Sequence, residues 1–168
     1  MKTEQIFFDG NKLELQVKKP SHFVVILLTS AASFCIIVPL VYFLVLLSES
    51  ATGNGIQYMT IIFLLIPLLF GIYLSRLFLW NFFGREVYEF GKDKISFYRD
   101  FRYFKDSKKT FKYKDLKIKL EKSGYENEKK AILSFDTKEG RHKSMVELPE
   151  NELEKLTELL NQKIKENL

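Results

Sequence analysis

Two long runs of uncharged, mostly apolar residues occupy the first half of the chain. Phe23–Leu47 contains no charged side chain over 25 residues, and Ile56–Ser75 contains none over 20. A helix needs about 20 predominantly apolar residues to cross the hydrocarbon core of a bilayer. Neither run shows the polar face at helical period that a core helix of a soluble domain carries. The pattern therefore predicts a transmembrane hairpin over 21–83, with helices at about 22–48 and 56–83.

Small residues within the two runs predict how the helices pack. Small side chains let helix backbones approach closely in lipid. Such residues gather at a similar depth in both runs, and we expect the helix contact to use Ser30, Ala31, Ser33, Gly71 and Ser75. No ionisable residue lies at the membrane centre, where an ion or proton pathway needs one. An anchor is therefore favoured over a channel or pore, and the small-residue face leaves oligomerisation open.

Lysine is distributed unevenly around the two runs. The segment before the first run carries Lys2, Lys12, Lys18 and Lys19, whereas the connection at 48–56 has no cation. The positive-inside rule places cation-rich segments in the cytoplasm. We therefore expect a multi-pass membrane protein with both termini cytoplasmic. The formal net charge of +5 also suits a protein held against an anionic leaflet.

The N-terminal tail carries the pattern of a β-hairpin. The stretch 5–8, with three apolar residues after Gln5, and a turn at 9–11 precede an alternation of apolar and polar residues over 13–18. A lone two-stranded hairpin is marginally stable in water. We therefore expect residues 1–20 to dock on the sheet of the C-terminal half, which lies on the same side of the membrane. The alternative is that the two phenylalanines of the tail dip into the bilayer interface.

The segment 84–168 is predicted to form antiparallel strands closed by one helix. Alternating apolar residues predict six strands, at about 88–90, 95–103, 111–113, 116–121, 131–135 and 145–148. The second strand is expected to bury its odd-numbered residues through Tyr103, and a turn is expected at 106–108. Apolar residues spaced by three and four positions then predict an amphipathic helix over about 150–166.

This order of elements, together with the step Phe-Lys-Tyr-Lys-Asp-Leu at 111–116, resembles the bacterial membrane-anchored PH-like proteins, including the YcxB-like group. The resemblance implies an α+β membrane protein of the bacterial inner membrane, with a cytoplasmic PH-like antiparallel sheet or barrel and one C-terminal helix. A PH fold has seven strands and one helix, so either the segment 84–168 contains a further strand or the N-terminal hairpin supplies the missing part of the sheet. We favour the second alternative, because it also gives the hairpin a partner. The resemblance also implies a binding or scaffolding module.

No motif in the sequence predicts catalysis. The chain has no phosphate-binding glycine loop, dinucleotide fingerprint, zinc-protease motif or nucleophile elbow. His22 and His142 are far apart in the sequence, and the single cysteine, Cys35, lies within the first apolar run. We therefore expect no metal site, no cofactor and no enzymatic activity.

One basic cluster is a candidate binding site for an anionic ligand. Aromatic residues are interleaved with its six members, Arg99, Arg102, Lys105, Lys108, Lys109 and Lys112. Such a cluster could bind a lipid headgroup beside an anionic leaflet, or stack and neutralise a soluble nucleotide. The simplest interpretation is that these residues form the solvent-facing side of alternating strands.

Three functions remain open from the sequence. The favoured one is a non-catalytic accessory or scaffold protein whose PH-like domain binds a protein partner or lipid headgroups. The alternative is a ligand-responsive membrane effector that oligomerises through its hairpin, like the two-helix effectors of bacterial antiviral systems. A membrane enzyme is least favoured. The expected partners are membrane lipid, another protein or a second copy of the chain, and no nucleic acid polymer is expected.

Overall fold

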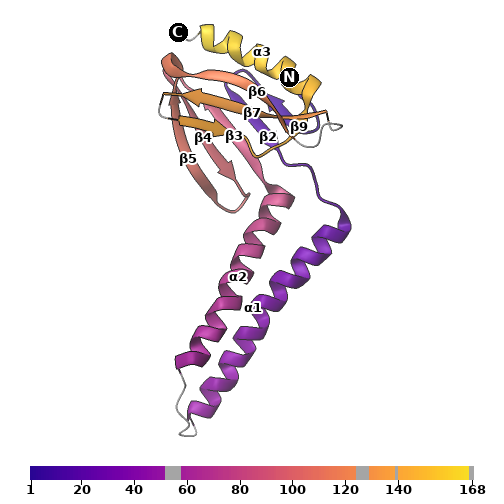
Figure 1. Ribbon diagram of the computed structural model, residues 1–168, viewed down its shortest axis with the longest axis vertical. Coiled ribbons are helices and arrows are strands. Elements are labelled where there is room, and N and C mark those ends of the chain that lie inside the picture. The colour runs from indigo at the N-terminus through magenta and orange to yellow at the C-terminus, as the bar shows by residue number, and fades with distance from the viewer. Residues whose placement is uncertain (52–57, 124–128, 139, 167–168) are drawn as a thin grey trace. The chain divides into compact units, whose positions relative to one another are not determined.

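The α+β architecture is evident in a computed structural model of the chain (Figure 1). The residues that it describes are 1–51, 58–123, 129–138 and 140–166. The chain divides into two compact units. One unit, Lys19–Phe82, contains two long helices, and the other combines Met1–Lys18 with Phe83–Leu168 and contains the strands and the last helix. Most of the predicted turn between the helices lies outside the described residues.

The helical unit is an antiparallel pair, α1 (His22–Ala51) and α2 (Tyr58–Phe83), which lie side by side (Figure 1). Both helices are long and apolar enough to cross a membrane. Only 11% of the most apolar window of each is buried within the chain, whereas the core helix of a soluble protein is mostly buried. Most of the apolar surface of each helix is therefore not covered by the rest of the chain and is available to lipid.

Gly71 allows the two helices to approach closely. A Cβ atom at this position would lie 2.7 Å from Cγ1 of Ile36 and 3.1 Å from Cβ of Cys35 on the neighbouring helix. Real Cβ atoms essentially never approach another heavy atom as closely as the first of these distances. The absence of a side chain at Gly71 therefore sets the helix separation here.

Two antiparallel sheets form the other unit. The first is ordered as its strands are numbered and consists of β1 (Ile6–Phe8), β2 (Lys12–Gln16), β3 (Arg85–Phe90), β4 (Lys94–Asp100) and β5 (Lys105–Lys112). A single 3₁₀ turn, Tyr113–Asp115, leads into the second sheet. That sheet consists of β6 (Lys117–Ser123), β7 (Lys130–Thr137), β8 (Gly140–Lys143) and β9 (Leu148–Pro149), with β6, β8 and β9 all paired to β7.

The N-terminal hairpin is an integral part of the first sheet. β2 pairs with β3 from Lys12 opposite Glu89 to Gln16 opposite Arg85. Leu13 and Leu15 are fully buried by this pairing. The alternation over 13–18 thus places one apolar face against the core. In the sequence, the helical unit therefore lies between β2 and β3, two strands that pair directly with each other.

The C-terminal helix, α3 (Glu150–Glu166), covers the second sheet, as Figure 1 shows. Its buried stripe has the three- and four-residue spacing of an amphipathic helix and consists of Leu153, Leu156, Leu160 and Ile164. Acidic residues lie in its first turn and lysines in its last, which complements the helix dipole. Thr3 also donates a 2.9 Å hydrogen bond to Oε2 of Glu152 and so ties the N-terminus to this helix.

The prediction of one long strand over 95–103 was wrong. β4 ends at Asp100, whose Oδ1 accepts a 2.8 Å hydrogen bond from the amide of Arg102. Arg102 has a φ of 74°, and the amide of Phe101 donates to the carbonyl of Phe104 at 3.0 Å. Tyr103 is therefore 72% exposed. The turn expected at 106–108 lies instead inside β5.

The last strand was also misplaced. The segment expected as a strand at 145–148 is mostly a connection. The next strand after β7 is β8, which pairs with it, and β9 adds two paired residues. The chain leaves the sheet at Ser144, because this residue and Met145 both bind the buried carboxylate of Glu86.

Candidate functional site

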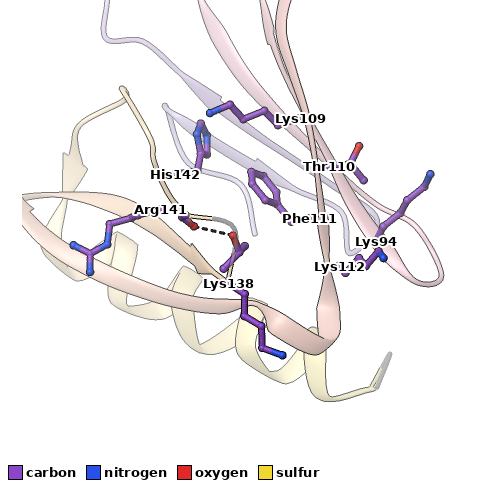
Figure 2. Close-up of a pocket in the computed structure, with 10 residues that line it drawn as sticks. Lys94, Lys109, Thr110, Phe111, Lys112, Lys138, Arg141 and His142 are labelled. Carbon is purple, nitrogen blue, oxygen red and sulfur yellow. Dashed lines mark hydrogen bonds between the residues drawn. The ribbon is translucent and has the colours of Figure 1, made fainter.

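An open hollow of about 750 Å³ lies between β5 and β8, which are outer strands of the two sheets within the described chain. It is lined by Lys94, Lys109, Thr110, Phe111, Lys112, Thr137, Lys138, Gly140, Arg141 and His142, and we call it the basic hollow. Figure 2 shows Lys109 and Phe111 extending from β5 toward His142, while Thr110 and Lys112 lie on the other side of the strand. The residues of one edge strand therefore line the hollow with both of its faces.

The outer edges of β5 and β8 carry backbone groups that pair with no other described strand. Within the described chain, β5 pairs only with β4, and β8 pairs only with β7. The amide of Tyr113 donates to the carbonyl of Asp93 at 3.4 Å, in the same register as the β4–β5 pairing. Hydrogen-bonded and non-hydrogen-bonded pairs alternate along an antiparallel ladder. The amides of Thr110 and Lys112 consequently point away from β4.

Few acidic groups offset the positive charges of the lysines in the basic hollow. Lys94 and Lys112 occupy directly opposed positions on β4 and β5, an arrangement that destabilises a sheet when the charges are alike. Neither lysine, nor Lys109, forms an ion pair with a described residue. Arg141 is different, because its Nε lies 2.7 Å from Oδ1 of Asp136. The described lining residues include no carboxylate.

His142 forms the inner wall of the hollow. Its side chain is 6% exposed, and its ring centroid lies 4.2 Å from that of Phe97 and 5.5 Å from that of Phe111. The buried Nε2 has no hydrogen-bond partner among the described residues. Burial, assisted by the positive charges of Lys109 and Arg99, lowers the pKa of His142 to about 4. The imidazole is therefore neutral at pH 7 and carries an unsatisfied polar atom.

The six cations of the predicted cluster do not form one site. Nε of Arg99 lies 3.6 Å from Oε1 of Glu86. Cζ of Arg102 lies 4.9 Å from the centre of the Phe83 ring, and Nζ of Lys105 lies 4.4 Å from that of Tyr98. Lys108 is exposed and does not line the hollow. Only the remaining two members, Lys109 and Lys112, line the basic hollow.

Sequence reasoning missed the other half of the site. Lys94 comes from β4, Lys138 follows β7, and Arg141 and His142 belong to β8. Pairing of β4 with β5 brings Lys94 next to Lys112. Packing of the two sheets brings Lys138, Arg141 and His142 to the same hollow. A register prediction for the β4–β5 hairpin is the one signal that could have placed Lys94 opposite Lys112.

The fully buried Glu86 is a structural clamp between the sheets. Its Oε2 accepts hydrogen bonds from Oγ of Ser144 at 2.6 Å and from the hydroxyl of Tyr88 at 3.2 Å. Its Oε1 accepts one from the amide of Met145 at 3.1 Å. Burial raises the pKa of Glu86, although these donors and Arg99 oppose the shift. Because donors occupy both oxygens, this carboxylate holds the fold together and has no free oxygen directed at a ligand.

Only some of the residues expected at the helix contact are buried there. Gly71 is buried and Ser75 half-buried, and the buried small residue of α1 is Ala32, next to the expected Ala31. Ser30 and Ser33 are exposed. The hydroxyl of Ser30 binds the carbonyl of Ile26 in its own helix, because a serine in a helix can satisfy itself locally.

No group of three or more metal-ligating side chains occurs among the residues with described positions. His22 and His142 belong to different units of the chain. No protein-family model matches the sequence. No curated protein matches it at a significant level.

Proposed function

We propose that this protein is a non-catalytic scaffold of the bacterial inner membrane, whose cytoplasmic PH-like domain holds an anionic protein partner. The observation that carries the proposal is the basic hollow, in which two free strand edges meet five cationic side chains. A hollow of this kind can offer backbone pairing and charge complementarity to a partner at the same time.

The strand order supports the PH-like part of the proposal. β2 to β5 make four antiparallel strands, β6 to β8 make three more, and α3 packs on the second sheet. These seven strands and one helix are the number in a PH fold, and β1 and the two-residue β9 are additional to it. The pairing of β2 with β3 gives the N-terminal hairpin its place in this count.

The helical unit supports the anchoring part. Two apolar helices of sufficient length are compatible with membrane spans, and the lysines before the first span favour cytoplasmic termini. Because the hairpin is inserted between β2 and β3, it is attached to the sheet through two chain connections. A partner bound to the domain would thereby be retained at the membrane.

Native mass spectrometry after mild extraction of the tagged full chain from its membrane tests this function. We expect a stoichiometric protein partner. A variant with Lys94, Lys109 and Lys112 changed to Glu should lose that partner. A matched variant with the exposed Lys108, Lys117 and Lys155 changed to Glu should keep it. A homo-oligomer that carries only lipid or a small molecule would contradict the scaffold and favour the ligand-responsive effector.

A further inference from the structure

We infer that the partner binds by strand addition: an extended acidic segment pairs with the free edge of β5 inside the basic hollow. This inference rests on the proposed function and specifies the chemistry of the partner. It predicts an occupant with several Asp or Glu side chains along a short β-strand.

The backbone of β5 is suited to receive another strand. Its edge is free over Lys105–Lys112 within the described chain, and the two outward amides belong to Thr110 and Lys112, which both line the hollow. Main-chain hydrogen bonds to such an edge supply affinity in strand addition, and pockets for alternate side chains supply specificity.

The placement of the cations matches the alternation of a strand. Side chains of a β-strand point to opposite faces in turn. On one face of β5, an incoming side chain would meet Lys109 and His142. On the other face, it would meet the opposed pair of Lys94 and Lys112 (Figure 2). Carboxylates on both faces of the added strand would therefore find cations.

A competing explanation is that the lysines of the edge strand β5 prevent it from pairing with strands of other molecules and so prevent aggregation. Protection does not require Lys94 and Lys112 to oppose one another. An acidic strand offsets this repulsion, because a carboxylate opposite Lys112 on the added strand would pair with its ammonium group.

A selection from random twelve-residue peptides displayed on phage tests the inference, with the full chain in phosphatidylcholine nanodiscs as bait. We expect enriched sequences to carry acidic residues at alternate positions and to protect the amides of Thr110 and Lys112 from hydrogen exchange. Failure to enrich peptides, enrichment of non-acidic peptides, or protection confined to other strands would each overturn the inference.

Substitutions at Thr110 separate backbone pairing from charge. Thr110→Pro removes one outward amide and no charge, whereas Thr110→Val keeps the amide. We expect the selected peptide to bind about tenfold more weakly to the proline variant and about equally to the valine variant. Equal binding to both variants would overturn strand addition. An anionic partner found by co-purification would then leave the scaffold function standing.

A scan of the peptide itself covers the case in which Thr110→Pro does not fold. Methylation of single backbone nitrogens in the selected peptide should weaken binding at every second position, because only alternate amides face β5. Uniform sensitivity, or none, would contradict an added strand.

Discussion

Oγ of Ser144 donates a 2.6 Å hydrogen bond to Oε2 of Glu86, which lies 58 residues earlier in the chain. The bond joins β3 of the first sheet to the segment that follows β8 of the second. With the amide of Met145 on the other oxygen, it fixes the position of the strand that carries His142. The buried carboxylate therefore controls the geometry of the basic hollow without lining it.

Removal of this carboxylate should destabilise the β-domain. Glu86→Ala removes an acceptor from Ser144, Tyr88 and Met145, of which Ser144 keeps the carbonyl of Val146 at 3.3 Å, and we expect a loss of about 2–4 kcal/mol in the free energy of unfolding. Hydrogen exchange of the buried β7 amides in the full chain measures this quantity. Glu89→Ala, at an exposed position, is the control. Equal effects of the two substitutions would contradict the clamp.

The stability of the β-domain should depend on His142 between pH 4 and pH 6.5. The folded pKa of about 4 lies below the ordinary value of 6.5, so the unfolded chain binds more protons in this window. The contribution of His142 is therefore lost as the pH falls from 6.5 toward 4, and it amounts to at most about 3 kcal/mol.

The same exchange measurement on His142→Phe isolates this effect. The raised pKa of Glu86 gives a slope of opposite sign above its ordinary value of 4.5, because stability from a raised pKa is lost as the pH rises. That slope is present in both proteins and cancels in the comparison. A difference between the two proteins that does not change with pH would contradict the buried, neutral imidazole.

The opposed lysines predict a trade-off between stability and binding. Lys112→Glu converts the like-charged pair with Lys94 into an attractive one, and we expect about 0.2–1 kcal/mol of added stability. The same change should weaken the binding of an acidic partner, which titration of the selected peptide measures. Lys108→Glu, at an exposed position outside the hollow, should leave peptide binding nearly unchanged. A destabilised Lys112→Glu domain would refute the charge argument.

The close helix approach predicts a disulfide. The Cβ position at Gly71 lies 3.1 Å from Cβ of Cys35, slightly less than the usual separation of about 3.5–4.5 Å in a disulfide. Gly71→Cys combined with Ile36→Ala, which removes the side-chain atom that a Cβ at position 71 would meet at 2.7 Å, should therefore cross-link the two helices on mild oxidation. With a protease site placed between the helices, the cleaved halves should stay linked on a non-reducing gel. Separation of the halves, or cross-links only between chains, would contradict the hairpin.

Local patterns predicted the elements whose neighbours in space are also neighbours in sequence. The period-two alternation over 13–18 and the three- and four-residue spacing in α3 are local signals, and the structure has a strand and a helix there. The turn at Phe101–Phe104 has no glycine or proline. It is made by the side chain of Asp100, so the apolar alternation ran through it unbroken. β8 was missed because its single buried residue is His142, which is not apolar, so the segment shows no alternation of apolar and polar residues.

The candidate site was less accessible to sequence reasoning. A cluster of cations along β5 is visible in the sequence, but strand alternation divides it between two faces. Glu86 then engages Arg99, and aromatic rings engage Arg102 and Lys105. Register within the β4–β5 hairpin places Lys94 in the basic hollow, and packing between the two sheets places His142 there. Neither position follows from the alternation of a single strand.

Site-specific photo-crosslinking from position 110 of the full chain, in cells, tests the central claim most directly. A benzophenone side chain there should form an adduct with a protein, and mass spectrometry should locate it in an acidic, extended segment of that protein. The same probe at the exposed Lys117 of β6 should not form this adduct. Adducts only with lipid, only with a second copy of the chain, or with equal yield from both positions would contradict the account.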